Sequence, residues 1–276
     1  MEFSQLPPRD TLLYMSCYCE ENIYKFVFQH VSVESLAYYT VMFLSNSTGT
    51  IPLFSQRLQT TPVFPVIWDY HVVLVYHPNQ TLEELLQRSE DMANRSIHVG
   101  DPESAGIANG SVATVAKSYV YDLDTRLLEF PCPAPVYFSR TFSPPPLLDF
   151  MNPLDRPSMT RALEQDRFRR YFRLVPAAAY LAYFWSERSH MRNDDGSWKM
   201  PPPAWGVIKG AQASKESFPE YIDFKGCEST GDRADPEAEY LGIIVDEERL
   251  WRVFGEGAVP GVEPLEQSTA EEDVAL

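Results

Sequence analysis

The stretch VIWDYHVVLVY, residues 66–76, decides how this chain is expected to fold. It is rich in β-branched and aromatic residues and contains no glycine or proline, which predicts a buried β-strand. Successive side chains of a strand point to opposite faces, so Asp69, His71 and Val73 are expected on the same face. The stretch therefore carries a histidine and an aspartate within a strand that is otherwise built to be buried.

The segments on either side of this strand predict a mixed α+β chain. Apolar residues at helical spacing, with acids in the first turn, predict a helix over 20–30. Thr81 and Glu84 form a capping box that predicts a helix over 81–94. The remaining predictions are strands at 37–44, 51–54, 119–124 and 240–245, a helix at 246–254, an irregular proline-rich region at 131–157 and a mostly helical region at 158–190, broken at Pro176.

The chain is expected to form one catalytic domain over residues 1–255. Residues 78–117 contain a stretch rich in glycine, serine and asparagine and are predicted to be a surface insertion. With that insertion set aside, the strands at 66–76 and 119–124 become hairpin neighbours. Residues 256–276 contain many acids and no basic residue, which predicts a disordered acidic tail.

Composition and charge exclude several classes of protein. The net charge of −16 repels phosphate backbones, so no nucleic-acid binding is expected. No apolar stretch is long enough to cross a membrane, and no signal peptide is visible. The four cysteines are few and unevenly spaced for a disulfide framework. We therefore expect a reducing, cytoplasmic location. A second location in the nucleus and a monomeric state are separate expectations, which composition does not decide.

Cys19, His71 and Asp122 are the residues expected to carry chemistry. Cys19 directly precedes the acidic first turn of the predicted helix, where the helix dipole and free N–H groups stabilise a thiolate and an oxyanion. A histidine held in a central strand is rigid enough to act as a general base. Asp122, at the end of the neighbouring strand, would accept the imidazole proton and fix its tautomer. On the residues alone, an inert cysteine, a core histidine and a turn-forming aspartate remain open alternatives.

Longer motifs around these residues are similar to those of a known family. SCYCEENIY at 16–24, VIWDYHVVL at 66–74, YVYDLDT at 119–125 and RSHM at 188–191 resemble the protein N-terminal glutamine amidohydrolases, as do FPC at 130–132, DGSWKMPPP at 195–203 and RVFG at 252–255. A cysteine on a helix followed by histidine and aspartate on successive strands also resembles papain-like and transglutaminase-like enzymes. The resemblance implies an α+β fold with the nucleophile on an N-terminal helix packed on an antiparallel sheet.

The resemblance implies a function for this chain. The substrate would be a polypeptide beginning with glutamine, and the products would be N-terminal glutamate and ammonia. Cys19 would be the nucleophile of a thioester mechanism, His71 the base and Asp122 its orienting carboxylate, with no metal or organic cofactor. Reading the free α-ammonium of the substrate requires acids near the nucleophile, for which Glu20, Glu21 and Asp69 are candidates. The converted N-terminus would then mark the protein for degradation.

Three alternatives stay open at this point. A transglutaminase-type acyl transferase would use the same three residues, with an amine in place of water. A metal-binding module would use Cys17, Cys19 and scattered histidines, although Cys132 and Cys227 do not form the second pair that tetrahedral zinc prefers. A non-catalytic interaction protein would use the proline-rich loops as docking segments.

Overall fold

A central antiparallel sheet organises the chain in the computed structural model, which describes residues 7–97, 117–145, 155–230, 233–234 and 239–255. The strand order in this sheet is β10 (Arg233–Ala234), β11 (Ile243–Asp246), β7 (Tyr171–Pro176), β1 (Tyr39–Ser45), β4 (His71–Tyr76), β5 (Tyr119–Tyr121) and β6 (Cys132–Pro133). Two short hairpins accompany it, formed by β2 (Ile51–Leu53) with β3 (Val66–Trp68) and by β8 (Trp185–Ser186) with β9 (Ile208–Lys209).

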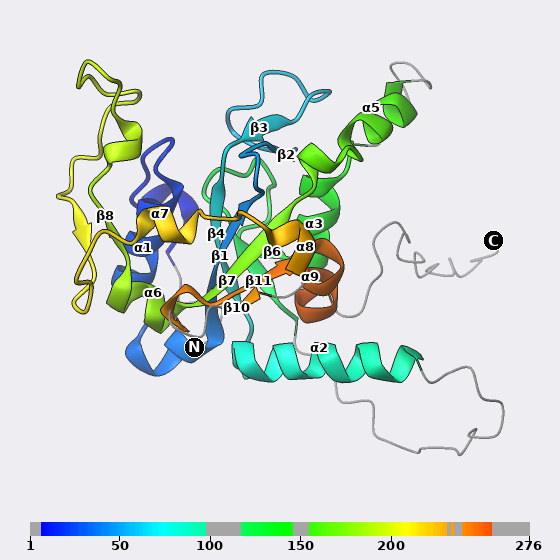
Figure 1. Ribbon diagram of the computed structural model, residues 1–276. Coiled ribbons are helices and arrows are strands. Elements are labelled where there is room, and N and C mark those ends of the chain that lie inside the picture. Colours follow the sequence, from blue (N-terminus) through cyan, green and yellow to red (C-terminus); the bar gives the residue numbers. More distant parts are fainter. Residues whose placement is uncertain (1–6, 98–116, 146–154, 231–232, 235–238, 256–276) are drawn as a thin grey trace, which may run out of the picture.

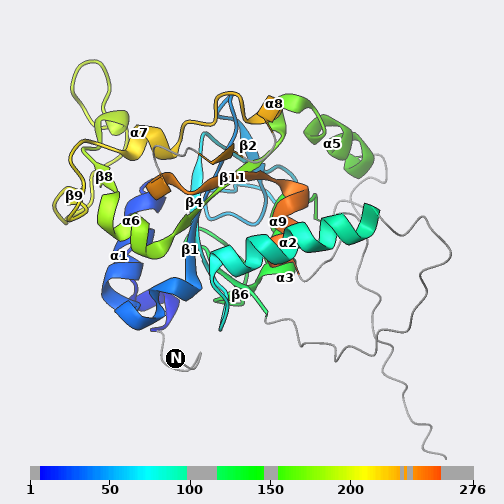
Figure 2. The same ribbon diagram turned by 60° about the horizontal axis from the view of Figure 1, so that its bottom comes forward.

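Helices cover both faces of this sheet (Figure 1). The α-helices are α1 (Cys19–His30), α2 (Leu82–Ile97), α3 (Ala134–Phe142), α5 (Asp155–Leu163), α6 (Ala177–Tyr183), α7 (Phe218–Tyr221), α8 (Cys227–Thr230) and α9 (Glu247–Phe254). The short 3-10 helices are η2 (Arg9–Thr11), η3 (Val33–Tyr38), η4 (Asp166–Phe168), η5 (Ser189–Met191) and η6 (Glu239–Leu241). Figures 1 and 2 show α1 and α6 on one side of the sheet, with α3 and α9 on the other.

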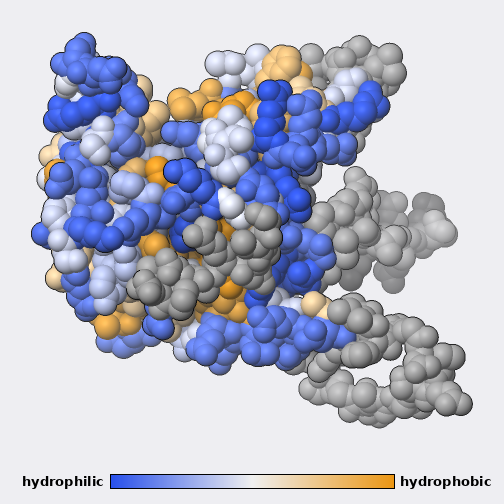
Figure 3. Space-filling view, viewed as in Figure 1, coloured by the Kyte–Doolittle hydropathy of each residue, from blue (hydrophilic) through white to orange (hydrophobic). Residues whose placement is uncertain are grey.

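The two faces of the sheet bury two separate apolar clusters. In β1, Val41 and Phe43 pack with α1 and α6, whereas Met42 and Leu44 pack with α3 and α9. This alternation follows from the period of two in a strand, and cover on both faces explains why every residue of β1 is buried. The outer surface in Figure 3 is mainly hydrophilic. None of the described helices is both long and apolar enough to cross a membrane.

Several sequence predictions are confirmed. The first helix is Cys19–His30, and the strands predicted at 37–44 and 51–54 are β1 and β2. The capping box is present, because the Thr81 N–H donates to Glu84 Oε2 (2.7 Å) and the Glu84 N–H donates to Thr81 Oγ1 (3.3 Å). The strands predicted at 66–76 and 119–124 are hairpin neighbours, since β4 and β5 pair antiparallel. The strand and helix predicted at 240–245 and 246–254 are β11 and α9.

Other predictions are wrong in part. The mostly helical region at 158–190 contains the central strand β7, whose first five residues are all buried and therefore show no alternation. The irregular region at 131–157 contains α3. The expected surface insertion at 78–117 begins with α2, where Leu82 and Leu85 are buried in the core beside α9. Residues 98–116 and the predicted acidic tail, 256–276, lie outside the described residues.

The predicted strand at 66–76 is interrupted, and this changes the surroundings of Asp69. β3 ends at Trp68 and pairs with β2, whereas β4 starts at His71 and pairs with β1. Hydrogen bonds at the interruption replace the ladder: the Tyr70 N–H donates to Asp69 Oδ1 (2.9 Å), and the Ser45 hydroxyl donates to the Asp69 carbonyl (2.6 Å). Asp69 is exposed and His71 is buried, so the prediction that they share one strand face is wrong.

Candidate active site

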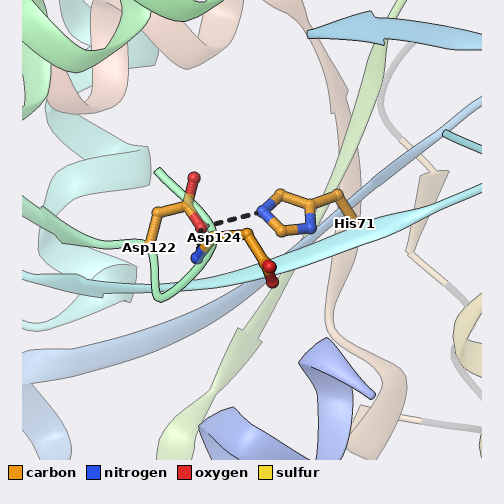
Figure 4. Close-up of side chains that lie close together, drawn as sticks. All are labelled: His71, Asp122 and Asp124. Carbon is orange, nitrogen blue, oxygen red and sulfur yellow. Dashed lines mark hydrogen bonds and ion pairs between the residues drawn. The ribbon is translucent and has the colours of Figure 1, made fainter. Parts of the chain in front are cut away.

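A buried histidine–aspartate pair lies at one end of β4. His71 is the first residue of β4, and Asp122 directly follows the neighbouring strand β5. His71 Nε2 and Asp122 Oδ1 are 3.0 Å apart, and neither side chain is exposed (Figure 4). The hairpin brings the two residues together although 51 positions separate them in sequence. The structure thus brings together two of the three residues expected to carry chemistry.

Asp122 is held as a carboxylate by four hydrogen-bond donors. Its Oδ1 accepts from His71 and from the Asp124 N–H (2.8 Å), and its Oδ2 accepts from Gln56 Nε2 (3.1 Å) and the Tyr137 hydroxyl (2.9 Å). Burial raises the pKa of Asp122, but the charge of His71 and these hydrogen bonds outweigh burial and leave that pKa below its usual value. Asp122 therefore remains ionised at neutral pH and has a fixed orientation.

His71 is fixed in place and keeps one ring nitrogen free of hydrogen bonds. Its ring stacks on Trp68 with centroids 5.1 Å apart. Burial lowers the pKa of His71, but the charge and hydrogen bond of Asp122, together with the charges of Asp124 and Glu20, outweigh burial and raise it above its usual value. Its Nδ1 is buried and has no hydrogen-bond partner among the described residues. This nitrogen can exchange a proton with a group that enters the site.

Cys19 stands at the N-terminus of α1, the helix that packs against β4. It is the first residue of the helix and is 4% exposed. The backbone of Val72, the residue after His71, acts to lower the pKa of the Cys19 thiol. Burial nevertheless raises the pKa of Cys19 well above its usual range, and the nearby charge of Glu20 adds to the rise. The sequence predicts a thiolate stabilised by the helix N-terminus, whereas the burial seen here favours the neutral thiol, which must give its proton to a base.

A further carboxylate, Asp124, lies beside this pair. Ligand atoms of His71, Asp122 and Asp124 lie within 4.8 Å of one another, and no other group in the described part of the chain has such metal-ligand spacing. Asp124 Oδ1 accepts the Tyr14 hydroxyl (2.6 Å). Neither Cys17 nor Cys19 belongs to this group.

Glu21, one of the three acids expected near the substrate, is already paired. Arg188 Nε and Nη2 donate to its two oxygens at 2.6 and 2.7 Å, and Trp205 Nε1 donates at 2.6 Å. Glu21 is fully buried, and the Arg188 side chain is 7% exposed. These contacts fasten the segment after β8 to the first turn of α1. Glu21 therefore has a structural role, and its carboxylate is not available to a substrate ammonium.

Glu20 and Asp69, the other two acids, lie at different depths near Cys19. Glu20 is fully buried, and the Cys19 thiol donates to its Oε2 over 3.7 Å. Asp69 is exposed, but its charge acts on both Cys19 and Tyr70. The Cys19 sulfur is therefore influenced by an exposed acid, Asp69, and by a buried acid, Glu20.

Sequence reasoning missed the residues that support the site. Gln56 and Tyr137 bind Asp122, Trp68 stacks on His71, and Tyr70 binds Glu20. Trp68 and Tyr70 stand in the WDYH motif, so their proximity to the histidine was a usable signal. Gln56 and Tyr137 lie 66 and 15 positions from Asp122, in segments whose local patterns give no reason to expect them there.

Comparison with known proteins identifies the family to which this chain belongs. A model of the N-terminal glutamine amidase family matches residues 14–254. Proteins named protein N-terminal glutamine amidohydrolase are similar to the chain: those of Bos taurus and Homo sapiens are each 32% identical over 219 residues, which is 78% of this chain and 79% and 80% of theirs. The Danio rerio protein is 31% identical over 221 residues, 78% of this chain and 81% of its own. The chain therefore belongs to the N-terminal glutamine amidase family.

Proposed function

We propose that this chain hydrolyses the side-chain amide of glutamine at the N-terminus of polypeptides, giving N-terminal glutamate and ammonia. Membership of the family and the names of its relatives support this activity. The observation that carries the mechanism is the buried His71–Asp122 pair at the end of β4, a strand that contacts α1, the helix that begins at Cys19. A thiol, a base and an orienting carboxylate are the groups that amide hydrolysis through an acyl-enzyme requires.

The reaction would proceed through a thioester. His71 removes the Cys19 proton, and the sulfur attacks the side-chain carboxamide carbon of the substrate. The C–N bond then breaks, and the leaving nitrogen takes the proton from His71 and departs as ammonia. A water molecule gives a proton to His71 and attacks the thioester, which releases glutamate and restores the thiol. Asp122 stabilises the imidazolium in both steps.

Backbone groups of α1 are suited to hold the negative charge that develops on the substrate oxygen. The first N–H groups of a helix have no acceptor within the helix. The N-cap residue, Tyr18, makes no side-chain hydrogen bond to this turn. An oxyanion formed next to Cys19 would therefore meet donors that are already oriented.

Asp69 is the best-placed acid for the α-ammonium of the substrate. The carboxamide must reach Cys19 in the interior, while the peptide that follows the glutamine must extend to solvent. The α-ammonium lies between these two ends, so its partner belongs near the entrance. Asp69 is exposed and acts electrostatically on Cys19, whereas Glu21 is already paired with Arg188.

We propose further that residues 1–255 form a single catalytic domain with a papain/transglutaminase-like arrangement of the three catalytic residues. The helix that begins at Cys19 packs against β4, and β4 pairs with β5 just before Asp122, which supports this arrangement. The protein is proposed to act as a cytoplasmic and nuclear monomer without a cofactor. Its net charge of −16 disfavours nucleic acid as a partner.

Ammonia release from two matched peptides tests the proposed function. One peptide begins with glutamine and the other with acetyl-glutamine. The wild-type protein should act on the first only, and Cys19→Ser on neither. Asp69→Asn should reduce the preference for the free amine, whereas Asp91→Asn, which changes an exposed acid on α2, should not. Ammonia release that requires an added amine would instead indicate the transglutaminase-type reaction. Absence of release from either peptide by a folded protein would refute the proposal.

A further inference from the structure

A second buried polar group, separate from the His71–Asp122 pair, lies against the nucleophile. The Tyr70 hydroxyl donates to Glu20 Oε2 (3.0 Å) and lies 3.4 Å from His190 Nε2. The Cys19 thiol approaches the same Oε2 at 3.7 Å. The other oxygen of Glu20, Oε1, is buried and has no hydrogen-bond partner among the described residues. A buried acceptor without a donor is unfavourable, which indicates a place that a ligand donor fills.

This group does not hold a fixed positive charge. His190 Nε2 is 3.7 Å from Glu20 Oε1, a distance at which two charged groups would count as an ion pair. Burial, with a smaller contribution from Lys199, lowers the pKa of His190 to about 4, so the imidazole is neutral at pH 7. Burial raises the pKa of Glu20 to about 8, which disfavours the charged form of this carboxyl. The group therefore suits an uncharged polar ligand better than an ammonium.

The structure assigns to Glu20 the recognition of the substrate's side-chain amide, an inference that rests on the proposed function. We propose that Glu20 Oε1 accepts an N–H of the glutamine carboxamide, and that Tyr70 and His190 position the carboxyl for it. The carboxamide nitrogen is bonded to the carbon that the Cys19 sulfur attacks. The sulfur is 3.7 Å from Glu20 Oε2, and Oε1 is the other oxygen of the same carboxyl, so we infer that Oε1 lies within reach of this nitrogen.

This contact would explain how the site favours glutamine over glutamate. The product side chain is an ionised carboxylate at neutral pH and has no N–H to donate. Beside Glu20 it would leave Oε1 unpaired and would place two carboxyl groups against each other. A site built to hydrogen-bond one group discriminates strongly against an analogue that lacks it. The same feature would favour release of the product.

The positioning residues are themselves fixed by packing. His190 lies in η5, and its ring centroid is 4.3 Å from that of Phe218. Arg188, which caps η5, is held by Glu21, the neighbour of Glu20 in α1. The geometry between His190 and Glu20 is therefore set from both ends by buried contacts.

Two substrates that differ only in the leaving group test this assignment. One peptide begins with glutamine, and the other begins with the γ-methyl ester of glutamate. Both give the same acyl-enzyme, but the ester has no N–H for Glu20 to accept. The value of kcat/KM is compared for each, because it reports the steps up to acylation. Glu20→Met removes the acceptor, so the ratio of amide to ester kcat/KM should fall by about 10- to 100-fold.

Two tyrosine-to-phenylalanine variants, each of which removes one hydroxyl, provide a control. They also test the assignment if Glu20→Met does not fold. Tyr70 donates to the Glu20 carboxyl, whereas Tyr180 donates to the Glu20 main-chain carbonyl (2.9 Å). Tyr70→Phe should lower the ratio, and Tyr180→Phe should leave it within about twofold. Equal losses on both substrates in Glu20→Met, or an unchanged ratio in Tyr70→Phe, would overturn the assignment. Wild-type protein that cleaves neither peptide would instead refute the proposed function.

Discussion

Asp122→Asn removes the negative charge beside His71 with little change in shape. The structure indicates that the fold can adapt to it. The Oε1 of Gln56 is buried without a partner among the described residues, so a rotated Gln56 amide can accept from the new Asn, and the Tyr137 hydroxyl can do the same. We therefore expect the free energy of unfolding to change by only about 1 kcal/mol.

The effect on catalysis should be much larger. His71 and Asp122 are 3.0 Å apart and neither is exposed, so solvent does not screen the pair. In the resting Asp122→Asn protein His71 can release its proton and stay neutral, but an imidazolium that forms in the transition state has lost its buried counter-charge, at a cost of about 3–5 kcal/mol. If the imidazolium forms in the transition state, a loss of about 4 kcal/mol corresponds to roughly a thousandfold lower kcat/KM.

The assay combines ammonia release from a glutamine-starting peptide with NMR titration of the His71 ring. Asp122 is the main influence that raises the pKa of His71, and burial opposes it. The pKa of His71 should therefore fall in Asp122→Asn. Asp124→Asn is the matched control: its carboxylate lies in the same cluster but binds Tyr14, so we expect a loss of about tenfold or less. A folded Asp122→Asn protein with activity within threefold of wild type, or with an unchanged His71 pKa, would refute this reasoning.

Two further predictions concern stability. Glu21→Gln should lower the free energy of unfolding by about 3 kcal/mol in urea titrations, because it leaves the buried Arg188 without its counter-charge. Glu247→Gln breaks a more exposed ion pair and should lower it by less than about 1 kcal/mol. Equal losses in the two variants would contradict the argument from burial. Burial lowers the pKa of His77 to about 4, below its unfolded value. The native state thus binds fewer protons than the unfolded state, and stability is lost as pH falls from about 6.5 toward 4. Thermal midpoints at pH 7 and pH 4.5 should differ less in His77→Gln than in wild type, and an identical difference in both proteins would contradict this assignment.

The sequence by itself determined the elements whose pattern is local. The helix at Cys19–His30 follows from apolar spacing of about 3.6 residues and acids in its first turn. The start of α2 follows from a capping box that spans only three residues. Strand β1 and the pairing of β4 with β5 also follow from short patterns. The WDYH and YDLD motifs are enough to indicate His71 and Asp122 as site residues, and the structure places these two side chains together.

Tertiary structure alone decided the features that depend on distant contacts. β7 is a strand because both of its faces are covered, and this cover removes the alternation by which a half-buried strand is recognised. Local sequence did not distinguish Glu21 from Glu20, yet Arg188, 167 positions away, pairs with Glu21. Glu20 Oε1 has no hydrogen-bond partner among the described residues. Burial raises the pKa of the Cys19 thiol although this residue begins a helix. Burial and long-range hydrogen bonds arise only when separate segments pack, so a local pattern cannot report them.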